Sequence, residues 1–280
     1  MDLPQEVSRE RLKRIRHVAL DMDGTIYNGK TLLPSTLPFL QTIQELSIGC
    51  TFLTNNSSKS TRDYVAHLAR FGIQADPEQI YTSTKATTAW LRREHPGIRR
   101  LFVLGTRSLR AELTDAGFIV TNDEAQDEPD AVLAGFDTEL NYARLCRAAY
   151  WIGQAKPYFA THPDLVCPTD EPTLLVDCGS ICCALEKATG RRPDEVLGKP
   201  DPAMLAGILG RYSLKVDELA MVGDRLYTDL AMARRTGVLG VLVLTGETTA
   251  ADVQEAGLPI DLVLPDLGEF GKQLRLAWQS

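Results

Sequence analysis

The chain has 280 residues, 44% of them hydrophobic, and a formal net charge of −7 from 30 basic and 37 acidic side chains. That length predicts about two domains and a sizeable core. No stretch approaches the ~18 consecutive apolar residues of a membrane helix, so we expect a soluble protein without membrane contact. The negative charge has the wrong sign for general binding to nucleic acid. Any bound phosphate must therefore be held by a local group of residues.

The cysteines and the N-terminal segment indicate which cellular compartment to expect for the protein. Six cysteines are scattered through the chain without the dense framework of small secreted folds. The first twenty residues are rich in arginine, but no apolar segment follows them as it would in a secretory signal. We therefore expect a protein of the reducing cytoplasm.

Apolar runs alternate with helical patterns from end to end, which is typical of an α/β protein with a mainly parallel sheet. A first strand is predicted at 15–20, directly before Asp21. A helical pattern over 37–46 is predicted to end at Gly49, and a second strand follows at 50–53. Strand, helix and strand together form one βαβ unit.

The same rhythm returns late in the chain, with a strand at 219–222, a helix from about 228 closed by Gly237, and a strand at 239–244. The middle of the chain has its own predicted elements: strands at 101–104, 118–121, 131–136 and 158–161, and a helix at 142–152. We therefore predict a Rossmann-like parallel-sheet core formed by 1–82 and 185–280, interrupted by an inserted α/β domain at 83–184.

The most informative motif is Asp21-Met22-Asp23-Gly24-Thr25 at the end of the first strand. Residues two apart in an extended chain point to the same side, so Asp21 and Asp23 can present their carboxylates together. Open α/β sheets bind ligands at this end of their strands. Two like charges brought together need a cation or a shared proton. Taken alone, the motif also fits an Asp-rich turn.

Three further groups follow predicted strands or rigid turns. Thr54 and Asn55 offer a hydroxyl and backbone N–H groups that suit phosphate oxygens, although the pair also fits a helix cap. Lys199 lies between Gly198 and two prolines and could neutralise a phosphoryl group, although it also fits a surface lysine. Asp224 and Asp229 offer oxygen ligands hard enough for Mg²⁺. Together these groups would meet at one sheet edge and form a metal-assisted phosphoryl site.

These four motifs, in this order, resemble the haloacid dehalogenase-like superfamily, whose pattern is DxDGT, a strand ending in Thr or Ser, a distant Lys, and GDxxxD. In detail, Thr54-Asn55-Asn56-Ser57, Gly198-Lys199-Pro200 and the stretch from Gly223 to Asp229 resemble its NagD-like, p-nitrophenyl phosphatase-like branch, subfamily IIA. The resemblance extends over nearly the whole chain.

The spacing of the motifs agrees with that branch. Thr54 follows Asp21 by 33 residues, which leaves no room for a cap domain, whereas Lys199 follows Thr54 by 145 residues. The resemblance implies that this second gap holds an α/β cap domain of the C2 type. Two positions depart from the family pattern. Relatives usually carry Asn where this chain has His162, and a Pro-Gly-small step where it has Val176-Asp177-Cys178.

The resemblance also implies roles for the acidic residues. Asp21 would be the nucleophile that becomes an aspartyl phosphate, and Asp23 would be the general acid and base. Mg²⁺ would be bound by the Asp21 carboxylate, the Asp23 backbone carbonyl and the Asp224 carboxylate, with Asp229 behind these ligands.

Phosphoryl oxygens would be held by Thr54, the Asn55 backbone and Lys199. We therefore expect a Mg²⁺-dependent phosphatase for small phosphate monoesters such as a nucleotide or a sugar phosphate. A phosphotransferase or mutase of the same fold, and a non-catalytic protein that binds phosphorylated metabolites, stay open as alternatives.

The cap is expected to select the substrate. Within the loop from 163 to 178, we predict that Cys167 and Asp170 contact the leaving group. Relatives with this cap are often homodimers, so we also expect a possible homodimer formed through the cap.

Overall fold

The computed structural model describes residues 7–169 and 172–279. The chain forms two compact units. We name them the core unit (Met1–Thr54, Phe71–Ile80 and Lys199–Ser280) and the cap unit (Asn55–Arg70 and Tyr81–Gly198). These units place 185–198 with the cap, whereas the sequence assigned that stretch to the core. The domain boundaries read from the sequence stay a prediction.

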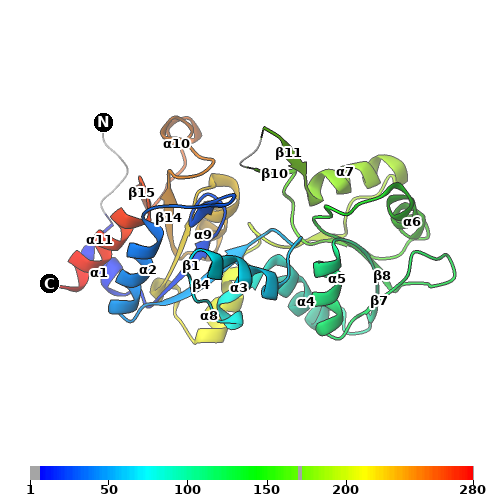
Figure 1. Cartoon of the computed structure of the whole chain (residues 1–280), viewed down its shortest axis with the longest axis horizontal. Coiled ribbons are helices and arrows are strands. Elements are labelled where there is room, and N and C mark those ends of the chain that lie inside the picture. Colours follow the sequence, from blue (N-terminus) through cyan, green and yellow to red (C-terminus); the bar gives the residue numbers. More distant parts are fainter. Residues whose placement is uncertain (1–6, 170–171, 280) are drawn as a thin grey trace. The chain divides into compact units, whose positions relative to one another are not determined.

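The core unit is built on a six-stranded sheet in the order β15-β14-β13-β1-β4-β5 (Figure 1). Strand β1 is parallel to both β4 and β13, so these three strands end at the same edge of the sheet. The early and late strand patterns therefore belong to one sheet, and the predicted parallel α/β core is confirmed. The strands are β1 (His17–Asp21), β4 (Gly49–Thr54), β5 (Ile80–Thr82), β13 (Leu219–Gly223), β14 (Leu239–Val243) and β15 (Leu262–Leu264).

Helices cover the core sheet, and a short ribbon of two antiparallel strands follows β1. Figure 1 shows α2 beside α11, and the rings of Phe39 and Phe270 pack between these helices with centroids 5.7 Å apart. The elements are α1 (Arg9–Lys13), the ribbon strands β2 (Tyr27–Asn28) and β3 (Thr31–Leu32), α2 (Thr36–Glu45), α8 (Ala203–Tyr212), the π-helical turn η3 (Leu226–Leu230), α9 (Ala231–Thr236), α10 (Ala250–Ala256) and α11 (Leu267–Trp278).

Gly49 does not end the first long helix, and that part of the sequence interpretation is wrong. Helix α2 ends at Glu45, and the chain reverses through Ser47, which has a φ of 56°. Gly49 is instead the first residue of β4, where a Cβ atom would collide with the ring of His17 on the neighbouring strand. This glycine therefore allows close approach of two strands.

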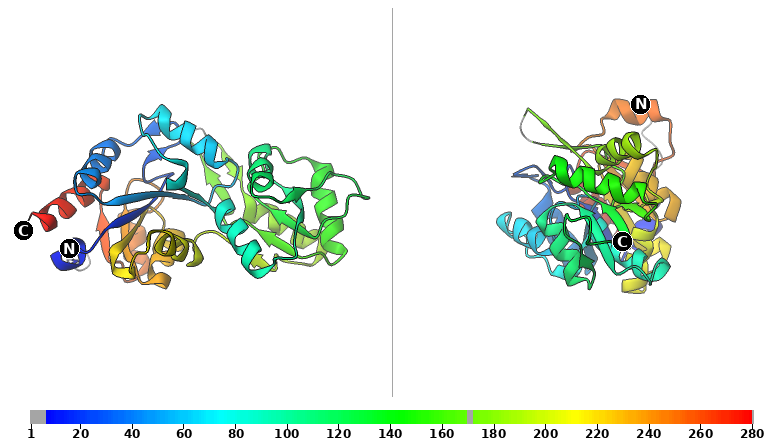
Figure 2. Two further views of the ribbon diagram at one scale, coloured as in Figure 1. Left: turned by 90° about the horizontal axis from the view of Figure 1, so that it is seen from below. Right: turned by 90° about the vertical axis from the view of Figure 1, so that its right-hand side faces the viewer.

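The cap unit contains a five-stranded sheet in the order β12-β9-β8-β6-β7. Alternate side chains of its strands face opposite layers of helices, as the twofold period of a strand requires. Phe102 and Val132 pack with α6 and α7, whereas Val103 and Leu133 pack with α4 and α5. Figure 2 shows the helices and strands of this unit, mostly in green. The strands are β6 (Arg100–Leu104), β7 (Ile119–Val120), β8 (Ala131–Ala134), β9 (Tyr158–Ala160) and β12 (Glu195–Val196), and the helices are α3 (Thr61–Arg70), α4 (Ser83–Glu94), α5 (Arg107–Asp115), α6 (Tyr142–Gly153) and α7 (Cys178–Thr189).

A two-stranded antiparallel hairpin lies between β9 and α7 in the chain of the cap unit. It consists of β10 (Val166–Pro168) and β11 (Leu174–Val176). The side chains of β11 are exposed. The sequence predicts a loop here, and the short strands are absent from that prediction because three-residue runs carry little periodicity.

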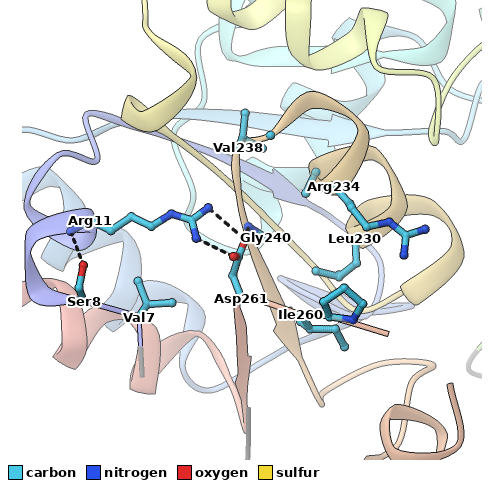
Figure 3. Close-up of a pocket in the computed structure, with 12 residues that line it drawn as sticks. Val7, Ser8, Arg11, Leu230, Arg234, Val238, Gly240, Ile260 and Asp261 are labelled. Carbon is cyan, nitrogen blue, oxygen red and sulfur yellow. Dashed lines mark hydrogen bonds and ion pairs between the residues drawn. The ribbon is translucent and has the colours of Figure 1, made fainter. Parts of the chain in front are cut away.

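A pocket beside β14 and β15 lies apart from the predicted site residues. It contains the Arg11 guanidinium, which donates to both carboxylate oxygens of Asp261 at 2.6 and 3.2 Å (Figure 3). Asp261 also accepts the backbone N–H of Gly240 at 2.9 Å. These paired charges tie the N-terminal helix to the sheet. Among the described helices, none combines the length and the apolar character that crossing a bilayer requires.

Candidate active site

Asp21 is the last residue of β1 and is buried. The chain then turns sharply, and the Met22 carbonyl accepts the backbone N–H of Ile26 at 2.9 Å. Gly24 has a φ of +82°, and a Cβ atom there would collide with the carboxylate of Asp224. Asp23 lies in the same turn and is half-buried. The glycine of the motif is therefore required both by the turn and by the close approach of a second acid.

Asp224 directly follows β13, the neighbour of β1. Its Oδ2 atom accepts the backbone N–H of Glu247 at 2.7 Å. Gly246 leaves no room for a Cβ atom against this carboxylate. The segment after β14 thus contributes a donor that the sequence analysis missed. The signal that could have found it is the position of Gly246-Glu247, which also follows a predicted strand of the parallel sheet.

Asp229 lies in the π-helical turn η3 and is fully buried. Its Oδ2 atom accepts the backbone N–H of Arg225 at 3.2 Å. Lys199 donates to the Asp229 Oδ1 atom at 2.8 Å and also to the Asp21 carboxylate. The ammonium therefore joins the end of β1 to the turn after β13.

Three buried carboxylates thus lie together, and two of them pair with one buried ammonium; we name this group the core cluster (Asp21, Lys199, Asp224 and Asp229). Oxygens of the three acids lie within 4.8 Å of one another. The structure brings together four of the predicted site residues that lie far apart in the sequence. The Asp23 side chain is not part of this group, although the predicted ligand there is its backbone carbonyl.

Burial and mutual repulsion change the acid strengths of the core cluster. Burial, followed by repulsion from Asp21 and Asp229, raises the pKa of Asp224 to about 8. Burial also raises the pKa of Asp229 to about 6, although Lys199 opposes that rise. For Lys199, burial favours the neutral amine, but attraction to Asp21 and Asp229 keeps its pKa above the ordinary value. The raised pKa values of Asp224 and Asp229 therefore reflect too little positive charge for the acids of this desolvated site.

A divalent cation would supply this missing positive charge. The Oδ1 atom of Asp224 is buried and accepts no hydrogen bond within the described residues. An orphaned buried carboxylate oxygen is costly unless a ligand satisfies it. Carboxylate oxygens are the donors that Mg²⁺ prefers. The residues present therefore match the predicted metal.

Thr54 is the last residue of β4, which ends at the same edge of the core sheet as β1, and Asn55 follows it. Asp21 lies opposite Leu53 in the β1–β4 register, so the next residue, Thr54, comes at the end of the adjacent strand. Both Thr54 and Asn55 are buried. Asn55 begins the cap unit, where its side-chain amide donates to both Asp164 oxygens at 3.2 Å. Their contacts with phosphate stay a prediction.

Of the two predicted specificity residues, Cys167 lies on β10 and is half-buried, with its Sγ atom 4.0 Å from the Asn56 side-chain nitrogen. Asp170 lies outside the described residues. In the sequence, His162 and Asp177 stand out only as departures from the family pattern. The structure places both at the base of the hairpin that carries Cys167.

Comparison with known proteins agrees with this fold and site. Two family models match, one described as haloacid dehalogenase-like hydrolase over residues 18–119 and one described as HAD-hydrolase-like over 196–270. The solved structure of a 4-nitrophenylphosphatase from Thermotoga maritima is 40% identical, with a TM-score of 0.88 over 94% of this chain and 98% of that chain.

Two further relatives are phosphatases by name. An acid sugar phosphatase of Staphylococcus aureus is 31% identical over 92% of this chain and 97% of its own length. A glycerol phosphate phosphatase of Mycobacterium tuberculosis, solved in complex with magnesium, is 29% identical, with a TM-score of 0.83 over 94% of this chain and 77% of that chain.

The chain belongs to the haloacid dehalogenase-like hydrolases, in the NagD-like and p-nitrophenyl phosphatase-like subfamily IIA. It is a phosphatase of this family, with a Rossmann-like core and an inserted α/β cap. The resemblance inferred from the four sequence motifs is confirmed.

Proposed function

We propose that the protein is a Mg²⁺-dependent phosphatase that hydrolyses small phosphate monoesters through a phosphorylated Asp21. The observation that carries the proposal is the core cluster, in which three buried carboxylates and one ammonium meet where the central strands of a parallel sheet end. Such a cluster suits phosphoryl transfer, which depends mainly on alignment and charge stabilisation.

In the first half of the reaction, an Asp21 carboxylate oxygen attacks phosphorus and the bond between phosphorus and the leaving oxygen breaks. Asp23 gives its proton to the departing alkoxide. In the second half, a water oxygen attacks the phosphorus and its proton goes to the Asp23 carboxylate. The bond between Asp21 and phosphorus then breaks and inorganic phosphate leaves. Asp23 suits this role because it is only half-buried, so it can reach the substrate.

The other site residues hold the phosphoryl group. Lys199, which donates to Asp21 and Asp229, would also donate a hydrogen bond to a phosphoryl oxygen. The Thr54 hydroxyl and the Asn55 backbone N–H would bind the remaining oxygens. Asp229 keeps the ammonium in place through the 2.8 Å bond to Lys199.

Asp21, the Asp23 carbonyl and Asp224 would hold the metal. When bound, Mg²⁺ supplies positive charge that offsets the carboxylates and polarises phosphoryl oxygens. The buried Asp224 Oδ1 atom, which has no other partner among the described residues, supports this part of the proposal.

The named activities of relatives define the substrate class to test first. They are a 4-nitrophenylphosphatase, an acid sugar phosphatase and a glycerol phosphate phosphatase. We therefore propose that a sugar phosphate or another small alcohol phosphate is the substrate, with Cys167 and Asp170 contacting its leaving group. A cytoplasmic location and a homodimer formed through the cap remain parts of this proposal.

Hydrolysis of p-nitrophenyl phosphate tests the proposed function. Asp21→Asn keeps the size of the side chain but removes the nucleophile, so we expect a loss of about 10³-fold or more, or roughly 4 kcal/mol of barrier. Activity should also disappear with EDTA and return with added Mg²⁺. Near-wild-type turnover by Asp21→Asn would remove this residue from the mechanism.

A further inference from the structure

A second group of charged side chains lies inside the cap unit, directly after β9. His162 is fully buried. Its Nδ1 atom lies 3.6 Å from Asp164 Oδ2, and its Nε2 atom lies 3.5 Å from Asp177 Oδ1. We name these three residues the cap cluster. Because the two carboxylates face different ring nitrogens, the imidazole bridges them.

The imidazole of His162 has a third polar neighbour, the Ser57 hydroxyl, whose Oγ atom lies 3.5 Å from Nε2. An ionised carboxylate only accepts hydrogen bonds, whereas a neutral imidazole has one donor nitrogen and one acceptor nitrogen. A neutral His162 can therefore donate from one nitrogen and accept the Ser57 hydroxyl hydrogen with the other. In either protonation state the ring lies between the two carboxylates and separates them.

Each carboxylate of the cap cluster holds a second element in place. Asp164 accepts the side-chain amide of Asn55. Asp177 is the N-cap of α7 and accepts the backbone N–H of Cys178. The two acids flank the β10–β11 hairpin, whose base is also closed by the Asp177 N–H donating to the Leu165 carbonyl at 3.0 Å.

The cap cluster also lies beside two chain segments that lead to predicted phosphate-binding residues. Asn55 directly follows Thr54, and Gly198 directly precedes Lys199. A Cβ atom on Gly198 would lie 2.7 Å from Asn55 Oδ1 and 2.9 Å from the His162 Cβ atom. A shift of His162 would therefore be transmitted to both segments, because close-packed interiors leave no slack to absorb it.

We propose that His162 is a positioning residue whose bridge between Asp164 and Asp177 fixes Asn55 and the base of the β10–β11 hairpin. This inference rests on the proposed function, in which the Asn55 N–H binds a phosphoryl oxygen. Loss of the bridge loosens Asn55 and weakens the hold on the phosphoryl group. The lost contact is made before and during the reaction, so substrate binding suffers more than turnover.

His162 and Asp177 are also two of the positions at which the chain departs from the family pattern. Their contact makes the departures a matched pair. His162→Asn leaves the buried Asp177 carboxylate without the ring that faces it, whereas Asp177→Asn leaves the ring facing one acid. We expect the double variant to bind substrate no worse than the single variant that binds it less tightly, because the two changes remove the same interaction.

The experiment measures kcat and KM for p-nitrophenyl phosphate and glycerol phosphate, and the inhibition constant for inorganic phosphate. In His162→Asn and in Asp177→Asn, we expect both KM values and the inhibition constant to rise about tenfold, with kcat within about threefold of wild type. If His162→Asn does not fold, Asp177→Asn alone decides, because it keeps the ring, its contact with Asp164 and an oxygen that caps α7.

His17→Asn serves as the matched control, since it also replaces a buried histidine but in the core unit. His17 bonds to Thr51 at 2.8 Å and packs against the ring of Tyr212, neither of which is a predicted site residue. It should lower stability and leave KM and phosphate inhibition unchanged. A loss of active protein alone would lower kcat in the His162 and Asp177 variants without raising KM, and that result would overturn the proposal. Additive effects in the double variant would overturn it as well.

The two proposals fail in different ways. If Asp21→Asn keeps wild-type activity, the proposed function fails whatever the His162 variants do. If Asp21→Asn is inactive but both cap variants keep wild-type KM values and phosphate inhibition, the function holds and the positioning role of His162 is wrong.

Discussion

The core cluster and the cap cluster are built from similar parts but differ in what their charges contact. In the core cluster, two of the three carboxylates, Asp21 and Asp229, pair with one ammonium, and a buried oxygen of Asp224 accepts no hydrogen bond within the described residues. In the cap cluster, two carboxylates face one imidazole, and each also accepts from an amide or a backbone N–H.

The difference separates a site for chemistry from a device for positioning. The core cluster keeps negative charge that a cation and a phosphoryl group can use, at the cost of the desolvation that raises the pKa of Asp224. The cap cluster uses its acids to fix backbone segments. The same side chains therefore serve different purposes according to how many of their oxygens the protein itself satisfies.

Removing the charge of Asp224 should have the largest effect. Asp224→Asn keeps an oxygen for the Glu247 N–H but deprives the cation of a carboxylate. We expect kcat/KM at limiting Mg²⁺ to fall about a thousandfold, or about 4 kcal/mol, with partial recovery at high Mg²⁺. A Mg²⁺ titration of p-nitrophenyl phosphate hydrolysis measures this.

Asp217→Asn is the control for that prediction, because Asp217 forms an exposed pair with Arg14 at 3.0 Å in the same unit. Its activity and Mg²⁺ dependence should match wild type. An Asp224→Asn enzyme with an unchanged Mg²⁺ requirement would show that this acid does not bind the metal.

The buried histidine of the core unit, His17, should make the stability of the protein depend on pH. His17 bonds to Thr51 and packs against the ring of Tyr212, and burial lowers its pKa to about 4. The unfolded chain takes up this proton near its ordinary pKa of 6.5, so the stabilisation is fully present above pH 6.5 and is lost as pH falls toward 4. Between pH 7 and pH 5 we expect a loss of about 2 kcal/mol that is absent in His17→Asn.

Urea unfolding at the two pH values measures that difference, since groups common to both proteins cancel. If wild type and His17→Asn lose the same free energy of unfolding on acidification, burial does not keep His17 neutral.

Gly198→Ala should disturb the cap cluster, because Gly198 packs closely against Asn55 and His162. Gly198 has a φ of +76°, and a Cβ atom would lie 2.7 Å from the Thr161 carbonyl oxygen. We expect a loss of about 1–3 kcal/mol of stability, because a left-handed backbone and a backbone clash combine. Gly153→Ala is the control, since a Cβ atom there meets nothing within 4 Å. Equal melting temperatures for the two variants would contradict the crowding described here.

Cys167→Ser should have the smallest effect. Cys167 lies on β10, on the hairpin flanked by Asp164 and Asp177. We expect the ratio of kcat/KM between glycerol phosphate and p-nitrophenyl phosphate to change about threefold, with an unchanged Mg²⁺ requirement. The exposed Cys146 gives the control Cys146→Ser. Equal losses on every substrate would count against a role in selectivity.

The parallel α/β core could be predicted from the sequence because each strand is a local apolar run. The candidate site residues could be picked out because they directly follow such runs. Asp21, Thr54 and Asp224 each follow a buried apolar run, and parallel strands end at a common edge. The order of motifs therefore sufficed to predict the family. The double hydrogen bonding of Lys199 could not be predicted, because it depends on the π-helical turn that carries Asp229.

The cap site was harder to predict. His162 and Asp177 are separated by a hairpin whose short strands leave little periodic signal. A lone histidine and a lone aspartate in a sequence give no indication that they meet. Only the structure shows that the N-cap of α7 also faces an imidazole.

Chemical trapping of the phosphorylated side chain tests the central claim most directly. Borohydride reduces an acyl phosphate to an alcohol, so treatment during turnover of p-nitrophenyl phosphate should convert Asp21 to homoserine. We expect mass spectrometry of the peptide to show this change at Asp21 only when substrate and Mg²⁺ are present. An unmodified Asp21 during full turnover, or modification at Asp23 instead, would contradict the account.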